Sequence, residues 1–194
     1  MSYRLSSDDL KGALTGWNRF LKKKVRLIAC GGTAMTLLGV KPSTKDVDFM
    51  VPDEGEYDYL LRQLKAIGYE SVTGNGWRLK GEDYQFDLYR GNKIHTTELL
   101  ESPLAPGRHT PLFTLSRLTV GILNDYDLIA SKLMRGTQVD YDDCLTLYEA
   151  HRDFIDLEKL VAHFEELVGY DIAEYRISVN IESFVEMLKE RGLA

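Results

Sequence analysis

Residues 25–51 read VRLIACGGTAMTLLGVKPSTKDVDFMV, and this stretch decides the fold. The apolar run at 25–30 predicts a strand, which leads through Gly31-Gly32 into a short helix. Residues 46–51 then predict a second strand, DVDFMV. A strand, a tight turn, a short helix and a second strand in this order predict a sheet with helices packed against it.

Two carboxylates stand out in the second of these strands. Asp46 and Asp48 are two residues apart, so on a strand they project to the same face. Parallel carboxylates repel each other unless a cation lies between them, and hard oxygen ligands of this kind suit Mg²⁺. The Gly31-Gly32 turn opens a helix, where free backbone N–H groups favour an anion such as phosphate. Together these features indicate phosphoryl or nucleotidyl transfer.

A third carboxylate, Asp87, lies in the centre of the strand candidate YQFDLY. If this strand lies beside the one that carries Asp48, the three aspartates share a face and form a two-metal platform. Asp87 is then the expected general base, and the catalytic effect is mainly electrostatic. Each feature alone has an ordinary alternative, because aspartates often cap strand ends or face solvent. Their joint occurrence in this order is more specific.

The remaining pattern predicts an α+β (α/β) fold, with a mixed β-sheet, flanking helices and a C-terminal helical region. Ser7 is the expected cap of a first helix that runs to about Lys23. Hairpin strands are expected at 69–89, a loop with at most one helical turn at 90–111, and a strand pair at 112–123.

Helices follow from Asn124 onward, with Asp140 expected to open one of them. A domain boundary near residue 120 separates a core domain, 1–120, from a helical domain, 121–194.

Composition narrows the class of protein. The chain has 194 residues and a net charge of −6, which argues against broad, charge-driven binding of nucleic acids or membranes. The sequence shows no signal-peptide pattern and no apolar run long enough to span a membrane. The two cysteines, Cys30 and Cys144, have no metal-binding spacing, so the expected environment is the reducing cytoplasm.

Other aromatic and histidine residues have less specific patterns. The four histidines, His95 among them, lack paired metal-ligand spacing and are expected to be structural or exposed on the surface. Tyr89 shares a strand face with Asp87, so it either stacks on a base or packs against the sheet.

The order of Gly31-Gly32-Thr33, Asp46-Val47-Asp48 and Asp87 resembles the DNA polymerase β-like nucleotidyltransferase superfamily. The resemblance covers roughly residues 25–90. It implies that Mg²⁺ binds to the three aspartates and that Gly31, Gly32 and Thr33 seat the triphosphate of an NTP. Thr33 keeps a hydroxyl where better-known members place a serine.

The run DLIASKLMRGTQVDYDDC is similar to a helical segment of AbiEii/AbiGii-type nucleotidyltransferases. Lys132 and Arg135 are three residues apart on a helix and could form a cationic clamp for phosphates. The alternative is that they pair with Asp140 or Asp143. Proteins of this type act in toxin–antitoxin or phage-defence systems, so the resemblance implies an antitoxin as a candidate partner.

The sequence thus predicts a Mg²⁺-dependent nucleotidyltransferase that moves a nucleoside monophosphate from an NTP to an acceptor hydroxyl. The acceptor class stays open between RNA, a protein and a small molecule, and no membrane partner is expected. One alternative is a catalytically silent nucleotidyltransferase-fold module with a binding or regulatory role. Another is a kinase-like phosphotransferase.

Overall fold

The computed structural model describes residues 4–194 and divides into two compact units that meet between Leu123 and Asn124. The sequence-based boundary near residue 120 falls inside the last strand of the first unit. The elements of the first unit are α1 (Ser7–Phe20), β1 (Val25–Ala29), α2 (Gly31–Leu37), β2 (Val47–Val51), α3 (Glu54–Ala66), β3 (Tyr69–Ser71), β4 (Gly76–Leu79), β5 (Phe86–Arg90), β6 (Lys93–Ile94), β7 (Thr97–Glu98), β8 (His109–Thr114) and β9 (Leu118–Leu123). Those of the second unit are α4 (Asp125–Leu133), α5 (Gln138–His151), α6 (Leu157–Val168), α7 (Glu174–Ile177) and α8 (Val179–Glu190).

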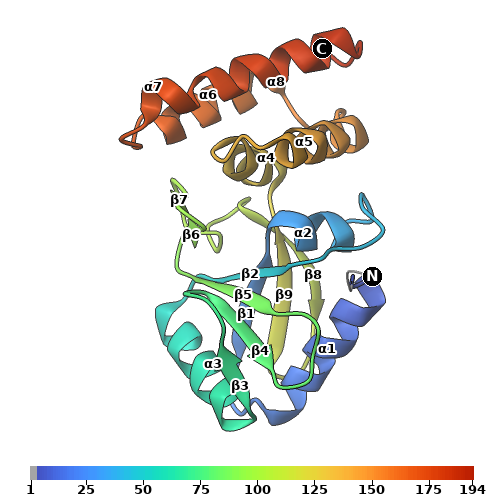
Figure 1. Cartoon of the computed structure of the whole chain (residues 1–194), viewed down its shortest axis with the longest axis vertical. Helices are drawn as coiled ribbons and strands as arrows, with labels where there is room; N and C mark the ends of the chain where they lie inside the picture. The colour runs from blue at the N-terminus through green and yellow to red at the C-terminus, as the bar shows by residue number, and fades with distance from the viewer. Residues whose placement is uncertain (1–3) are drawn as a thin grey trace. The chain divides into compact units, whose positions relative to one another are not determined.

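A mixed, seven-stranded sheet organises the first unit, with the strand order β3-β4-β5-β2-β1-β9-β8 (Figure 1). Strand β1 pairs antiparallel with β2 and parallel with β9, and β2 pairs parallel with β5. The predicted fold class is therefore confirmed, including the strand pair that completes one edge of the sheet. The central strands carry the core, and every residue of β2 is buried.

Helix α1 begins and ends earlier than the sequence suggested. Its N-cap is Ser6 rather than Ser7, since the Ser6 hydroxyl accepts the Asp9 N–H and the Asp9 carboxylate accepts the Ser6 N–H. The helix ends at Phe20, not near Lys23. Beyond it, the N–H groups of Lys22 and Lys23 donate to the Tyr59 hydroxyl instead of continuing the helical pattern.

Strand β2 also starts one residue later than expected. Its first residue is Val47, so Asp46 lies just before the strand and is exposed. The loop expected at 90–111 contains the short hairpin β6–β7 and the start of β8. Strands of two residues carry no hydrophobic periodicity, which is why the sequence pattern missed them.

Both edges of the sheet are poor templates for further pairing. Strand β3 has three residues, and β8 contains Pro111, with a register irregularity between Pro111 and Phe113. Proline cannot donate a ladder hydrogen bond, so it is confined to such edges.

The second unit is helical, as predicted. Helix α4 is capped by the Asn124 side chain, which accepts the Asp127 N–H. Helix α5 opens at Thr137 rather than Asp140, because Thr137 and Asp140 form a capping box. Among residues 4–194, none of the helices combines the length and hydrophobicity needed to cross a membrane.

Candidate functional site

Asp48 and Asp87 lie opposite each other in the parallel pairing of β2 and β5. Register partners on neighbouring strands share a face of the sheet, so both carboxylates project to the same side. Asp48 is almost fully buried, with 6% of its surface exposed. The sheet therefore brings together two of the three predicted acidic residues.

The Asp87 carboxylate is half-buried and accepts hydrogen bonds from Gln85 Nε2 at 3.2 and 3.4 Å. Burial raises the pKa of Asp87, and the negative charge of Asp46 raises it further against the opposing effect of the Gln85 bond. Gly76 of β4 lies opposite Asp87, and a Cβ there would come within 3.1 Å of Asp87 Oδ1. This glycine leaves room for the carboxylate.

Asp46 joins the group from outside the strand. Its carbonyl oxygen accepts hydrogen bonds from the hydroxyls of Thr44, at 2.7 Å, and Thr33, at 3.2 Å. After burial, its negative charge contributes to the raised pKa of Asp87. Asp46 is thus anchored through its backbone, while its side chain is exposed.

Thr33 holds the backbone on both sides of Val47. Its hydroxyl donates to the Asp46 carbonyl and accepts the Asp48 N–H at 2.9 Å, and the side chain is fully buried. The predicted contact between the Thr33 hydroxyl and a triphosphate stays a prediction. In the structure Thr33 fixes the start of β2, and through it the position of Asp48.

The two glycines at the start of α2 allow close packing around Asp48. Gly31 has φ +55°, and a Cβ on it would lie 2.7 Å from Asp48 Oδ2. A Cβ on Gly32 would lie 2.7 Å from Thr44 Oγ1. Glycine is therefore needed at position 31 for two reasons: the backbone is left-handed there, and the Asp48 carboxylate packs against its Cα.

Tyr89 and His95 also lie near Asp48, where the sequence left Tyr89 open between stacking on a base and packing and expected His95 to be structural or exposed. Tyr89 is 2% exposed, and its hydroxyl donates to Asp48 Oδ1 at 3.3 Å and lies 2.9 Å from His95 Nδ1. Burial, and then the Asp48 charge, raises the pKa of the Tyr89 phenol. Of the two alternatives for Tyr89, the structure shows packing within the sheet. The sequence could have placed Tyr89 at the site, because Tyr89 is two residues from Asp87 and such a spacing puts both side chains on one face of a strand.

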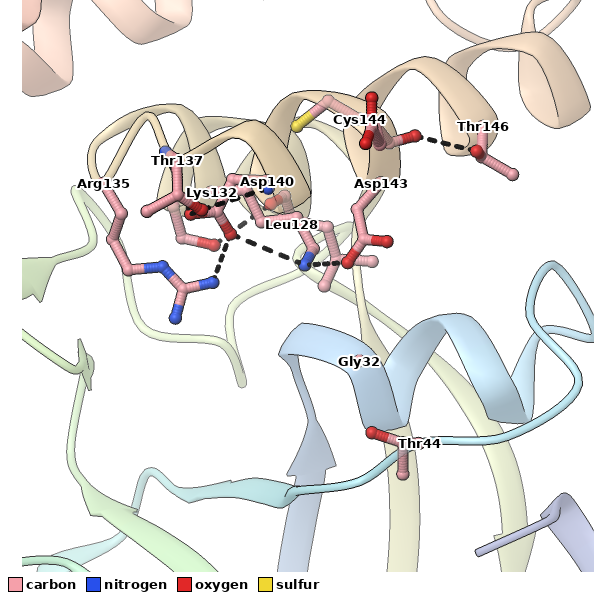
Figure 2. A network of polar contacts seen from close by, with 12 residues as sticks. Gly32, Thr44, Leu128, Lys132, Arg135, Thr137, Asp140, Asp143, Cys144 and Thr146 are labelled. Atoms are coloured by element: carbon pink, nitrogen blue, oxygen red, sulfur yellow. Dashed lines mark hydrogen bonds and ion pairs between the residues drawn. The ribbon is translucent and has the colours of Figure 1, made fainter. Parts of the chain in front are cut away.

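Lys132 and Arg135 belong to the second unit, where they form ion pairs (Figure 2). Lys132 is 3% exposed, and its Nζ lies 2.7 Å from Asp143 Oδ2 and 4.0 Å from Asp140 Oδ1. Arg135 pairs with Asp140, whose carboxylate also accepts the Thr137 hydroxyl at 2.7 Å. The sequence left open whether these cations clamp phosphates or pair with aspartates, and the structure shows the pairing.

Within residues 4–194, no three His, Cys, Asp or Glu side chains are arranged to hold a metal ion together. Asp46, Asp48 and Asp87 therefore do not form a preformed three-ligand metal centre. Mg²⁺, however, is usually bound through one or two carboxylates together with substrate phosphates. Oxygen ligands from Asp48 and Asp87 fit that pattern.

No protein-family model matches the chain, and no curated protein matches it. Among solved structures, the chain is similar to an antigenic nucleotidyltransferase-like protein from Paracoccidioides brasiliensis. That likeness has a TM-score of 0.49 and 17% identity, over 93% of this chain and 95% of the other.

A second similar structure is ANT(2")-Ia in complex with adenylyl-2"-tobramycin. Its TM-score is 0.39 and its identity 14%, over 84% of this chain and 88% of that one. Likeness at these levels does not assign a function to the chain.

Proposed function

We propose that the protein is a Mg²⁺-dependent nucleotidyltransferase that transfers a nucleoside monophosphate from an NTP to an acceptor hydroxyl. The observation that carries this proposal is the register pairing of Asp48 with Asp87, with the Gly31 turn against the Asp48 carboxylate. Two neighbouring carboxylates beside a glycine turn suit a metal–triphosphate complex.

The chemistry of the donors fits the hard cation Mg²⁺ and not a thiol- or imidazole-binding metal. Asp48 and Asp87 would hold the ion, with Asp46 as a further carboxylate beside them. The raised pKa of Asp87 reflects burial and a neighbouring negative charge, which a bound cation would relieve. When bound, Mg²⁺ supplies charge neutralisation on the phosphoryl oxygens.

The residues of the site then have distinct roles. Asp87 accepts the proton of the acceptor hydroxyl as its oxygen bonds to the α-phosphorus and the bond to the β-phosphate oxygen breaks, which releases pyrophosphate. Thr33 keeps Asp48 in position, and Gly31 leaves room for the Asp48 carboxylate.

The acceptor stays a choice between RNA, a protein side chain and a small molecule. A place in a toxin–antitoxin or phage-defence system, with an antitoxin as partner, is proposed from the sequence resemblance at Lys132 and Arg135 alone. Their role as a phosphate clamp and the cytoplasmic location likewise stay predictions.

The test is release of pyrophosphate from each NTP in the presence of Mg²⁺ and cell extract, with labelled product identified. We expect Asp48→Asn and Asp87→Asn to abolish pyrophosphate release. Asp83→Asn, at an exposed aspartate four residues from Asp87, is the matched control and should retain it. A nucleoside diphosphate product would instead indicate a kinase-like phosphotransferase.

A silent binding module is the second candidate, favoured by the lack of a preformed three-ligand centre among the described residues. Calorimetry with ATP, GTP, CTP and UTP, with and without Mg²⁺, separates the two. Metal-dependent binding that is lost in the double variant Asp46→Ala, Asp48→Ala supports the enzyme. Absence of binding to any nucleotide supports the silent module.

A further inference from the structure

His95 has a backbone conformation that side chains rarely adopt. Among residues 4–194 it is the one non-glycine residue with a positive φ, at +52°. It is the first of two turn residues between β6 and β7, whose last pair is Ile94 with Thr97. Glycine or asparagine is the usual choice at such a turn position. A histidine there calls for a reason outside the turn.

The turn places the His95 ring against Tyr89. The ring centroids are 5.0 Å apart at an angle of 64°, and His95 Nδ1 lies 2.9 Å from the phenol oxygen. Tyr89 has a single hydroxyl proton, which it donates to Asp48 Oδ1. Both ring nitrogens of His95 lie within hydrogen-bond distance of the phenol oxygen, Nε2 at 3.2 Å. With the phenol proton donated to Asp48, a protonated ring nitrogen of His95 donates to the phenol oxygen, and the hydrogen bonds run from His95 through Tyr89 to Asp48.

This chain of hydrogen bonds constrains one side of the Asp48 carboxylate. Asp48 Oδ1 accepts a hydrogen bond from Tyr89. Asp48 Oδ2 packs so closely against Gly31 that a Cβ on this glycine would lie only 2.7 Å from it. The carboxyl group is thus held on both sides. Outer hydrogen-bond partners of this kind orient metal ligands and are important for metal affinity.

We propose that Tyr89 and His95 are positioning residues that fix the orientation of Asp48 for metal binding. The inference rests on the proposed function, because it assumes that Asp48 binds a divalent cation. In this left-handed turn conformation the His95 ring reaches the Tyr89 hydroxyl.

The experiment measures Mn²⁺ affinity by electron paramagnetic resonance, together with kcat, KM and the melting temperature. We expect Tyr89→Phe to weaken Mn²⁺ binding about tenfold and to lower kcat for pyrophosphate release with little change in the KM for the NTP. The matched control is Tyr69→Phe, which removes a buried hydroxyl that accepts a hydrogen bond from Trp17 Nε1 at 3.1 Å. The control should leave Mn²⁺ affinity unchanged.

Variants of His95 separate positioning from folding. His95→Gly relaxes the turn, so it should not lower the melting temperature, yet it should weaken Mn²⁺ binding. His95→Asn tolerates the left-handed backbone and keeps a side-chain N–H, so it should restore part of the affinity.

Two results would overturn the positioning role, and they are distinguishable. If the unaltered protein binds Mn²⁺ and both Tyr89→Phe and His95→Gly bind it equally well, the positioning role alone is wrong. If the unaltered protein binds no Mn²⁺, the proposed function fails and the positioning role fails with it.

Discussion

Asp48 of β2 and Asp87 of β5 are direct partners in a parallel pair of strands, and the same register places Met50 beside Tyr89. A shift of one residue would turn Asp87 to the other face of the sheet. Hydrophobic residues flank both aspartates along their strands and are buried, Val47 and Phe49 on one and Phe86 and Leu88 on the other. Burial of these four side chains therefore holds the two carboxylates together.

Asp87→Asn should make the metal-free protein more stable at neutral pH. Because burial and Asp46 raise the folded-state pKa of Asp87, the folded protein holds this proton more tightly than the unfolded chain. Stability is therefore lost as the pH rises from the unfolded pKa through the folded one. Urea unfolding in EDTA should give Asp87→Asn a higher free energy of unfolding than the unaltered protein at pH 7. The two free energies should be equal below about pH 4. An equal difference at both pH values would contradict this.

Gly31→Ala should abolish activity while it destabilises the fold. Its new Cβ would meet Asp48 Oδ2, in addition to the strain of a positive φ. Gly39 is the matched control, since it also has a positive φ, at +77°, but nothing lies within 4 Å of its added Cβ. Gly39→Ala should lose only about 1 kcal/mol of unfolding free energy and keep its activity. Equal activity in the two variants would show that the approach to Asp48 is unimportant.

Thr33→Val should lower the unfolding free energy by about 2 kcal/mol, because it leaves the buried Asp48 N–H without its partner, while the Asp46 carbonyl keeps only its hydrogen bond from Thr44. Thr33→Ser keeps the hydroxyl and should lose less. Urea denaturation of both variants gives the comparison. If Thr33 instead served mainly as a phosphate ligand, Thr33→Val would raise the KM for NTP without affecting stability.

Asp143→Ala should destabilise the second unit by about 3 kcal/mol, because it leaves the Lys132 ammonium buried with only the more distant Asp140. The double variant Lys132→Met, Asp143→Leu removes both charges and should recover part of that loss. Thermal unfolding of the single and double variants measures the coupling. Additive effects would show that the pair does not interact energetically.

The sequence predicted the arrangement around Asp48 well, because the pattern was local. Short apolar runs located β1 and β2, a central Asp87 between apolar residues located β5, and the glycines located the start of α2. From the sequence we only assumed that β2 and β5 are neighbours, and the structure shows that they are. Asp46 was placed inside the strand because a period of two cannot fix where pairing begins.

What the sequence could not show depends on contacts between distant residues. Nothing in the sequence near Thr33 indicates that its hydroxyl accepts a hydrogen bond from the backbone N–H of Asp48, fifteen residues later. His95 lies in a hairpin whose strands are too short to show a periodic pattern of apolar residues. Its positive φ could not be predicted from the residue type, because histidine rarely adopts that conformation. The sequence left two alternatives open for Lys132, and the ion pair with Asp143 became visible only when α4 packed against α5, whereas the phosphate clamp stays a prediction.

The two edge strands of the sheet, β3 and β8, affect whether copies of the protein can aggregate by strand pairing. An unpaired outer strand is a place where a second chain can add on and begin a fibre. Here one outer strand is three residues long, and the other is interrupted by Pro111 and an irregular register. The molecule thus carries its own barriers to strand-by-strand polymerisation, and replacing Pro111 with a β-branched residue would remove one of them.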